Sequence, residues 1–252
     1  NRKSVTRQLR ENDAEALRQR ALQRREMMKA HRLRDALNQI DRTNIIAEIK
    51  RASPSKGAIN DIIDVVDVAR AYSAGGAAAI SVLTETEYFK GSLDDLREVR
   101  AAVELPILRK DFIVDEFQIY ESAAYGADAI LLIVAALTDV GLRNFLLVAR
   151  DELKMDAIVE VHNAAELSRA INVGADIVGV NNRDLHSLDV SLRPSRDLIK
   201  YRLPEALMIA ESGITNRKEI DELRQLGYDA FLIGETLMRA DDIEGELKRL
   251  NG

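Results

Sequence analysis

Four short segments of this sequence repeat one pattern, and the repeat leaves few folds open. Each segment has a glycine, then a small or aromatic residue, then the start of an apolar run. The glycines are Gly76, Gly126, Gly174 and Gly227. A glycine before such a run is typical of the left-handed residue that ends a helix. Successive glycines lie 50, 48 and 53 residues apart, the length of two strand–helix units. The repeat therefore predicts eight units.

From residue 45 onward, short apolar runs alternate with amphipathic stretches of helical period. The predicted strands lie near 45–50, 78–84, 106–112, 129–134, 156–161, 177–182, 207–212 and 230–235. The predicted helices lie near 62–74, 92–103, 115–125, 138–153, 164–173, 194–201, 216–226 and 241–250. Strands that alternate with helices pair in parallel through right-handed crossovers.

Eight such units predict an α/β protein with a closed (β/α)₈ TIM barrel. An open doubly wound sheet is the main alternative. That fold carries a glycine-rich dinucleotide turn after its first strand, whereas the loop at 53–57 reads Ser-Pro-Ser-Lys-Gly. We therefore expect residues 45–252 to form a single catalytic barrel domain.

Residues 1–44 form a different kind of segment. Apolar residues recur at three- and four-residue steps over residues 4–40, which predicts helix, and the length favours a break into two helices. The segment carries 12 Lys and Arg against 6 Asp and Glu, whereas the rest of the chain carries 24 against 36. It lacks aromatic residues that could stack on bases, so we expect no nucleic-acid binding. We expect a helical extension packed on the barrel.

Composition excludes several kinds of chemistry. The chain has no cysteine, which excludes disulfides, thiolate metal sites and cysteine nucleophiles. Three histidines argue against a histidine-rich metal site. No apolar run is long enough to span a bilayer, and the N-terminus lacks the pattern of a secretory signal. We expect a cytoplasmic protein with no metal and no membrane partner.

Ionisable side chains gather on the odd-numbered predicted strands. Glu48 and Lys50 lie on the first, Lys110 on the third, Glu160 on the fifth and Glu211 on the seventh. Alternate strands of a barrel contribute to the same interior layers, so these side chains would meet near the C-terminal mouth. Buried charges are costly unless they are paired. The cluster indicates an active site, and the alternative is an ion-pair network that only fills the barrel.

Glycines near the mouth suggest a phosphate site. The seventh strand ends in Ser212 and Gly213, and the eighth in Gly234. Loops after these two barrel strands commonly bind phosphate through backbone N–H groups. Lys50 and Ser53 could add a charge and a hydroxyl donor. The alternative is that both glycines only make turns.

Other polar and aromatic residues allow two readings each. Phe89 and Phe112 follow the second and third strands and could wall an aromatic substrate or simply pack. Arg183 could hold an anion or pair with its neighbouring aspartate. His162 could join Glu160, but a lone histidine at a strand end is more often a surface residue. Asp111 should point away from Lys110, and we assign it no chemistry.

The barrel region resembles indole-3-glycerol phosphate synthases. The similarity extends from about residue 45 to 238. It rests on IIAEIKRASPSKG (45–57), SVLTETEYFKGS (81–92), PILRKDFIVDEFQI (106–119), AILLIVAAL (129–137), IVEVHN (158–163), GVNNRDL (179–185), IAESGI (209–214) and FLIGETLM (231–238). Residues 1–44 align poorly, although the resemblance implies that this extension packs near the mouth of the active site.

The resemblance implies a ring closure in tryptophan biosynthesis. The substrate would be 1-(2-carboxyphenylamino)-1-deoxyribulose 5-phosphate, which loses carbon dioxide and water. The family uses no cofactor or metal. By motif position, Lys110 resembles the general acid, Glu160 the general base, and Glu48 with Lys50 a supporting pair, although either lysine could protonate a departing oxygen. The residues that resemble orienting groups are Asn181, Glu211, Ser212 and Arg183.

The resemblance also assigns the two ends of the substrate. The phosphate site corresponds to Ser53, Gly213, Gly234 and the backbone of Glu235. The pocket for the aromatic ring corresponds to Phe89, Phe112, Leu131 and Ile133. The acidic side chain of Glu235 must turn away from the phosphate for this assignment to hold.

Two alternatives remain beside this interpretation. Phosphoribosylanthranilate isomerase is another phosphate-binding barrel, but one acid and one base could run its reaction without five charged residues. An inactive barrel that only binds a phosphorylated ligand is the non-enzyme alternative, although every proposed catalytic side chain is present. We expect a monomer that acts on a small phosphorylated substrate.

Overall fold

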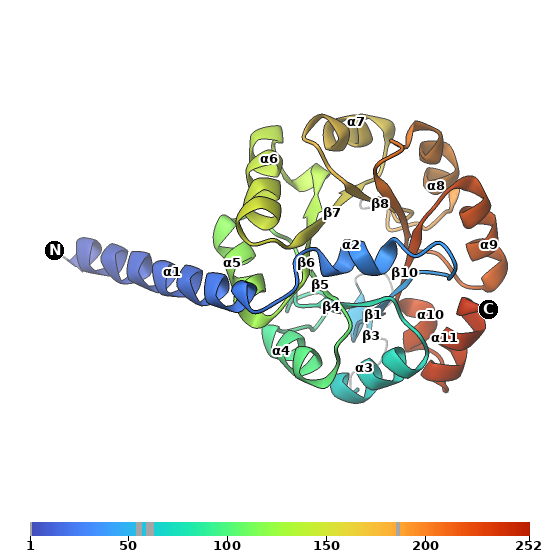
Figure 1. Cartoon of the computed structure of the whole chain (residues 1–252), viewed down its shortest axis with the longest axis horizontal. Helices are drawn as coiled ribbons and strands as arrows, with labels where there is room; N and C mark the ends of the chain where they lie inside the picture. Colours follow the sequence, from blue (N-terminus) through green and yellow to red (C-terminus); the bar gives the residue numbers. More distant parts are fainter. Residues whose placement is uncertain (1, 54–56, 59–62, 185–186) are drawn as a thin grey trace.

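Eight parallel strands close into a barrel in the computed structural model, which describes residues 2–53, 57–58, 63–184 and 187–252. The barrel strands are β1 (Ile45–Ile49), β4 (Ala79–Leu83), β5 (Ile107–Lys110), β6 (Ala129–Ile133), β7 (Asp156–Val161), β8 (Ile177–Asn181), β9 (Leu207–Glu211) and β10 (Ala230–Ile233). Strand β1 pairs with both β4 and β10, so the sheet has no free edge (Figure 1). This closure confirms the predicted TIM barrel and excludes the open sheet.

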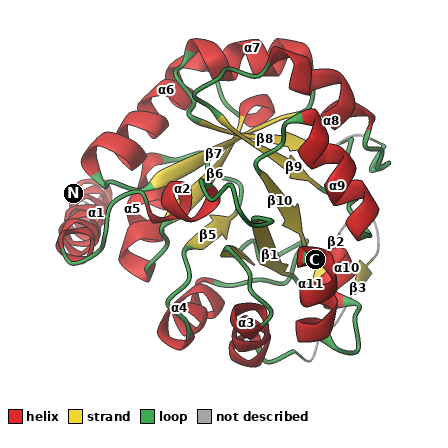
Figure 2. Cartoon of the chain, turned by 45° about the vertical axis from the view of Figure 1, so that its right-hand side comes forward, coloured by secondary structure: helices red, strands yellow, loops and turns green. Residues whose placement is uncertain are grey.

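A ring of helices surrounds the strands (Figure 2). The helices are α3 (Val65–Ala74), α4 (Leu93–Ala102), α5 (Glu116–Tyr125), α6 (Asp139–Leu147), α7 (Ala164–Asn172), α8 (Arg193–Leu198), α9 (Arg217–Leu226), α10 (Glu235–Met238) and α11 (Ile243–Asn251). Most begin after a residue whose side chain accepts a hydrogen bond from the first turn, which favours a helix start there. These caps are Asp64, Ser92, Asp115, Thr138, Asn163, Asn216 and Asp242. The four repeat glycines all have positive φ, as predicted.

Some local features differ from the prediction. The expected helix 138–153 ends earlier and continues as a π-helical turn over Val148–Glu152. The short helix α10 was not predicted, nor was the two-stranded hairpin of β2 (Ala52–Ser53) and β3 (Gly57–Ala58). Residues 54–56 of the loop at 53–57 lie outside the described residues. No helix in the described part of the chain is long and apolar enough to cross a membrane.

The barrel interior explains where the charged residues point. Aliphatic side chains fill it, among them Ile46, Leu108, Ile158 and Ile209 from β1, β5, β7 and β9. Successive side chains alternate between the two faces of a strand, so the residue two positions further on also faces inward. Those residues are Glu48, Lys110, Glu160 and Glu211. The two-residue period of the strands thus places four charged side chains in the barrel interior, on the C-terminal side of the aliphatic layer.

The N-terminal extension forms two helices, which confirms the predicted break. Helix α1 (Arg2–Glu26) packs along α5 and projects beyond the barrel (Figures 1 and 2). Helix α2 (Arg32–Leu37) buries Leu33 and Leu37 against residues at the starts of the strands. Helix α2 therefore covers the N-terminal end of the barrel. The expectation that the extension packs near the active-site mouth is wrong for α2, because its leucines close the opposite end.

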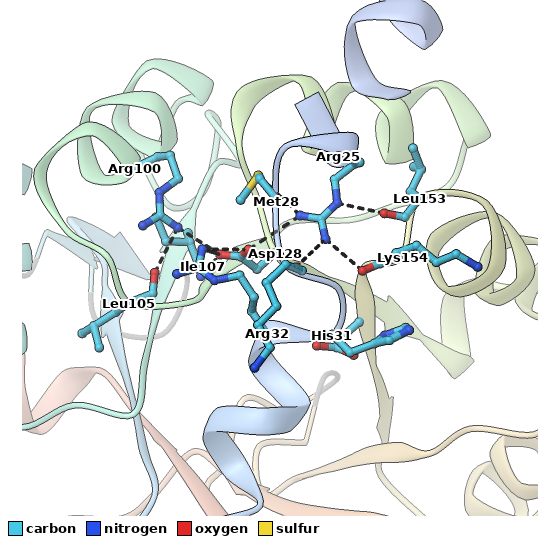
Figure 3. A network of polar contacts seen from close by, with 12 residues as sticks. Arg25, Met28, His31, Arg32, Arg100, Leu105, Ile107, Asp128, Leu153 and Lys154 are labelled. Carbon is cyan, nitrogen blue, oxygen red and sulfur yellow. Dashed lines mark hydrogen bonds and ion pairs between the residues drawn. The ribbon is translucent and has the colours of Figure 1, made fainter. Parts of the chain in front are cut away.

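A buried aspartate ties the extension to the barrel (Figure 3). Asp128, just before β6, is fully buried and has three arginines around it. Its carboxylate lies 3.1 Å from Arg32, 3.0 Å from Arg100 and 3.6 Å from Arg25, and it accepts a hydrogen bond from the backbone N–H of Ile107. Burial lowers the pKa of both Arg25 and Arg100, because it withdraws their charges from water.

Similar contacts repeat around this end of the barrel. Arg25 also donates to the carbonyls of Leu153 and Lys154, at 2.8 Å each. Asp156, at the start of β7, faces His31 at 3.0 Å and accepts from the backbone N–H of Arg34 at 2.9 Å. Polar groups before or at the starts of the strands thus fix the segment between α1 and α2.

We expect Asp128→Asn to destabilise the protein by about 3 kcal/mol or more, because three guanidinium groups would then surround a neutral amide. Urea unfolding followed by circular dichroism measures the effect. The control is Asp94→Asn, which removes an exposed pair with Arg97 and should cost less than about 1 kcal/mol. An equal loss in the two variants would contradict the anchoring role of Asp128.

Candidate active site

A cavity of about 740 Å³ opens at the C-terminal ends of the strands. Its floor is charged, with Glu48, Lys110, Glu160 and Glu211 among the residues that line it. One wall is apolar, and the opposite wall is made of the polar loops after β9 and β10. The cavity therefore combines an aromatic-sized apolar surface, ionisable groups and exposed backbone in one space.

Lys110 lies at the centre of the charged floor. Its Nζ atom lies 3.3 Å from Oε2 of Glu160 and 3.4 Å from Oε2 of Glu211. The side chain of Lys110 is 14% exposed, and both carboxylates are almost completely buried. A cation thus sits between two carboxylates that come from different strands.

The pKa values of these three groups are strongly perturbed. Burial acts to lower the pKa of Lys110, but the carboxylates of Glu211, Glu160 and Glu48 outweigh it and raise that pKa well above its usual range. Burial raises the pKa of Glu211 to about 7, and repulsion from Glu160 and Glu48 adds to the effect. Glu160 is also buried, but Lys110 and His162 lower its pKa to about 2. At neutral pH Lys110 is therefore protonated and Glu160 ionised, whereas Glu211 retains a proton in part of the molecules.

Glu48 and Lys50 form a second pair beside this group. Nζ of Lys50 lies 2.7 Å from Oε1 of Glu48, and both side chains are largely buried. Burial opposes ionisation of Glu48, but Lys50 and Lys110 overcome it and lower the pKa of Glu48. The five charged residues singled out in the sequence therefore form two adjoining clusters.

His162 does not lie on the surface, contrary to expectation. Its side chain is 14% exposed, and its Nε2 atom lies 3.3 Å from Oε1 of Glu160. Its Nδ1 atom lies 3.0 Å from Oε2 of Glu166 in α7. The strand β7 ends at Val161 and α7 begins at Ala164, so this short connection keeps His162 between Glu160 of the strand and Glu166 of the helix. Its burial follows from this short connection.

The loop after β9 has a special backbone conformation. Ser212 has φ of 66° and Gly213 has φ of 79°. Positive φ is unusual for a residue with a side chain and indicates a conformation that the surroundings enforce. The side-chain amide of Asn182 donates to the carbonyl of Ser212 at 3.2 Å and holds the loop. Asn182 was not among the proposed site residues, although its place at the tip of β8 was a usable signal.

The remaining polar candidates also line the cavity. Asn181 is buried at the end of β8, where its Oδ1 accepts from the backbone N–H of Arg183 at 3.0 Å. Glu235 lies 3.2 Å from Arg239 and 4.0 Å from Arg183, so two arginines compensate its charge. The Oγ atom of Ser53 is buried without a hydrogen-bond partner among the described residues.

Aromatic and aliphatic side chains make the apolar wall. The rings of Phe89 and Phe112 lie 6.5 Å apart and are tilted by 47°. Leu131 and Ile133 on β6 continue this surface toward the floor. Asp111 is engaged elsewhere, because it accepts hydrogen bonds from Arg109, Thr84 and the backbone of Phe112.

Two glycines make room for the buried carboxylates. A Cβ atom on Gly179 would lie 2.0 Å from Oε1 of Glu211. A Cβ atom on Gly234 would lie 2.6 Å from Oε1 of Glu48. Gly179 escaped notice in the sequence, because a glycine within a strand does not reveal which side chain of a neighbouring strand needs the space.

Known structures share this architecture. A thiamine phosphate pyrophosphorylase from Pyrococcus furiosus matches with a TM-score of 0.63 and 18% identity, over 86% of this chain and 95% of that one. A 3-hexulose-6-phosphate synthase from Salmonella typhimurium matches with a TM-score of 0.67 and 14% identity, over 82% of this chain and 96% of that one. At these identities the similarity concerns the fold alone.

Sequence comparison is more specific. An indole-3-glycerol phosphate synthase of Koribacter versatilis is 51% identical over 211 residues, covering 82% of this chain and 80% of its own. One from Desulfosudis oleivorans is 49% identical over 208 residues, with 82% and 79% covered. The family model for indole-3-glycerol phosphate synthase matches residues 1–250. The chain therefore belongs to the indole-3-glycerol phosphate synthase family, a group of ring-closing, decarboxylating lyases of tryptophan biosynthesis.

Proposed function

We propose that Lys110 is the general acid and Glu160 the general base of the indole-forming reaction. One observation carries the proposal: the buried Nζ atom of Lys110 lies within 3.4 Å of two carboxylates at the floor of the cavity. A lysine acts as an acid only when it is protonated at the working pH, and the carboxylates favour that form. An ionised glutamate beside it is ready to accept a proton.

The proposed reaction proceeds in three steps. The ring carbon that carries the carboxylate attacks the ketone carbon, and Lys110 gives a proton to the ketone oxygen, which becomes a hydroxyl. Carbon dioxide then leaves, and the electrons of the broken bond return to the ring and restore its aromaticity. Finally Lys50, or Lys110 after it has been reprotonated, gives a second proton to the hydroxyl, which departs as water, while Glu160 accepts the proton that the new ring releases. Every proton transfer uses side chains of this chain.

The other charged groups support these steps in the proposal. Glu48 holds Lys50 at the rim, where its ammonium can reach the substrate anions. Glu211 and Asn181 orient the reacting atoms from β9 and β8, and Arg183 adds a cation near the mouth. Such positioning matters because ring closure requires a flexible sugar chain to be held folded.

We propose that opposite walls hold the two ends of the substrate. The aromatic ring would lie against Phe89, Phe112, Leu131 and Ile133. The phosphate would accept hydrogen bonds from Ser53 and from the backbone at Ser212, Gly213, Gly234 and Glu235. The pairing of Glu235 with Arg239 supports this assignment, because it reduces the repulsion of an anion by that carboxylate.

We also propose that one chain is sufficient for activity and that the enzyme acts in the cytoplasm as a monomer. All the proposed reacting side chains come from the strands of a single barrel, so no second subunit is needed to complete the site. Light scattering of the active enzyme tests the oligomeric state.

Lys110→Met is expected to lower kcat by at least about 10²-fold in a folded protein, because the variant lacks the acid. Indole fluorescence follows product formation from 1-(2-carboxyphenylamino)-1-deoxyribulose 5-phosphate and so measures the loss of kcat. Circular dichroism verifies that the variant is folded. The matched control is Lys200→Met, at an exposed lysine that lies over the ring of Tyr201. A folded Lys110→Met variant with undiminished kcat would exclude the proposed acid.

Glu211→Gln is expected to stabilise the enzyme at alkaline pH. The pKa of Glu211 is raised from 4.5 to about 7, so the folded state binds this proton more tightly than the unfolded chain. The stabilisation from that proton is complete below pH 4.5 and is lost as the pH rises through 7. As the pH rises from 5 to 8, we expect the free energy of unfolding of the variant to increase by about 1–3 kcal/mol relative to that of the wild type. Urea unfolding at both pH values measures it; a difference independent of pH would contradict the raised pKa.

Gly213→Ala is expected to raise KM about tenfold, because alanine strains a backbone with φ of 79° and its Cβ would lie 2.5 Å from Val190. Steady-state kinetics gives KM. The matched control is Gly174→Ala, which has φ of 81°, open space around it and a position at the other end of the barrel. The control introduces a similar backbone strain, and its KM should equal that of the wild type. Equal KM values in both variants would remove the support for phosphate binding here.

A further inference from the structure

Two carboxylates compete for the role of base in this site. Glu160 and Glu211 lie 3.3 Å and 3.4 Å from the same Nζ atom of Lys110, and both are almost completely buried. Their distances to the lysine therefore do not explain why one should be ionised and the other hold a proton. Some other group must distinguish them.

The difference lies behind Glu160. Its Oε1 atom, on the side away from Lys110, lies 3.3 Å from Nε2 of His162, although without hydrogen-bond geometry. Both side-chain oxygens of Glu211 lack a hydrogen-bond partner among the described residues. Asn181 adds a polar contact to Glu160 from β8. A second cation thus faces one carboxylate and not the other.

His162 itself is held firmly. Glu166 accepts from both the backbone N–H and the Nδ1 atom of His162, at 2.8 Å and 3.0 Å. Glu166 is fixed in turn by Asn163, whose side chain donates to it at 2.7 Å and accepts from its backbone N–H at 3.0 Å. These bonds cap the N-terminus of α7. The imidazole therefore bridges two carboxylates in a fixed orientation.

Both carboxylates favour the charged form of the imidazole. Burial acts to lower the pKa of His162, but Glu160 and Glu166 raise it to about 9. The other charges near Glu160 are Lys110 from β5, Glu48 from β1 and Glu211 from β9, and of these Lys110 and Glu48 act on Glu211 as well. Among these charged groups, His162 contacts Glu160 but not Glu211. It is not among the residues that line the cavity, so it would act on the reaction through Glu160.

We infer that His162 is a positioning residue that assigns the base role to Glu160: held by Glu166, its imidazolium keeps Glu160 the ionised member of the two carboxylates around Lys110. The inference rests on the proposed role of Glu160 as the base. Two titratable groups whose environments separate them take different roles in catalysis. Without His162, the proton that Glu211 holds near neutral pH would be shared with Glu160, and that fraction of molecules would lack a base.

The test is the pH profile of His162→Gln. We expect kcat to fall about tenfold at pH 6 and by less than threefold at pH 8.5, because both carboxylates are ionised at the higher pH. KM should stay within twofold, because His162 does not line the cavity. The matched control is His31→Gln, which removes an imidazole 3.0 Å from Asp156 at the other end of the barrel. The control should match the wild type at both pH values.

The outcomes separate the possibilities. A profile of His162→Gln that parallels the wild type, whatever its height, would overturn the inference and leave His162 as a helix-capping residue whose loss lowers the melting temperature. A pH-dependent loss of kcat supports it. If Glu160 were not the base, Glu160→Gln would keep its activity, and the proposed function rather than this inference would be at fault.

A second measurement does not depend on the folding of that variant. The chain has three histidines, so a proton NMR titration can resolve each ring. We expect the His162 ring of the wild type to stay protonated up to about pH 9 and to lose its proton at lower pH in Glu166→Gln. A wild-type His162 that titrates near its ordinary value of 6.5 would also overturn the inference.

Discussion

Alternate residues of every barrel strand point into one closed interior, and both the stability and the chemistry of this protein depend on that constraint. Near the starts of the strands the inward-pointing side chains are aliphatic and pack together as an apolar core. Two residues later on β1, β5, β7 and β9 they are Glu48, Lys110, Glu160 and Glu211. Because the interior is small and has no open edge, these charges cannot avoid one another. Their mutual contacts then set which of them is ionised.

Such a cluster works against folding, although the proposed mechanism depends on it. The carboxylate of Glu211 is buried with a raised pKa, so its ionisation costs free energy near neutral pH. The neighbouring Glu160 is held ionised by cations on both sides. The pair thus provides, in one space, a group that holds a proton and, in the proposed mechanism, a group that accepts one. Catalytic sites commonly retain such destabilising groups, and the rest of the fold compensates for them.

The compensation lies at the other end of the barrel. There, Asp128 before β6 and Asp156 at the start of β7 bind an arginine and a backbone N–H of the N-terminal extension. Helix α2 adds Leu33 and Leu37 to the apolar filling. Ionic contacts at this end are paired and fixed, whereas those at the mouth line a cavity. The two ends of the same strands therefore divide stability from chemistry, as is usual in barrels of this kind.

The sequence by itself determined the barrel and most of its charged site. The repeat glycines indicate left-handed helix ends, and the strand period of two decides which face of the sheet each side chain takes. Both signals lie within a few consecutive residues, so the sequence reveals them. What it could not determine is which side chains meet across strands. Four features depend on neighbours that are distant in the chain. They are the burial of His162, the hydrogen bond from Asn182 to Ser212, the space that Gly179 leaves for Glu211, and the position of α2 at the N-terminal end of the barrel. Only closure of the barrel and the docking of its loops decided them, because such contacts are set by register and packing in three dimensions.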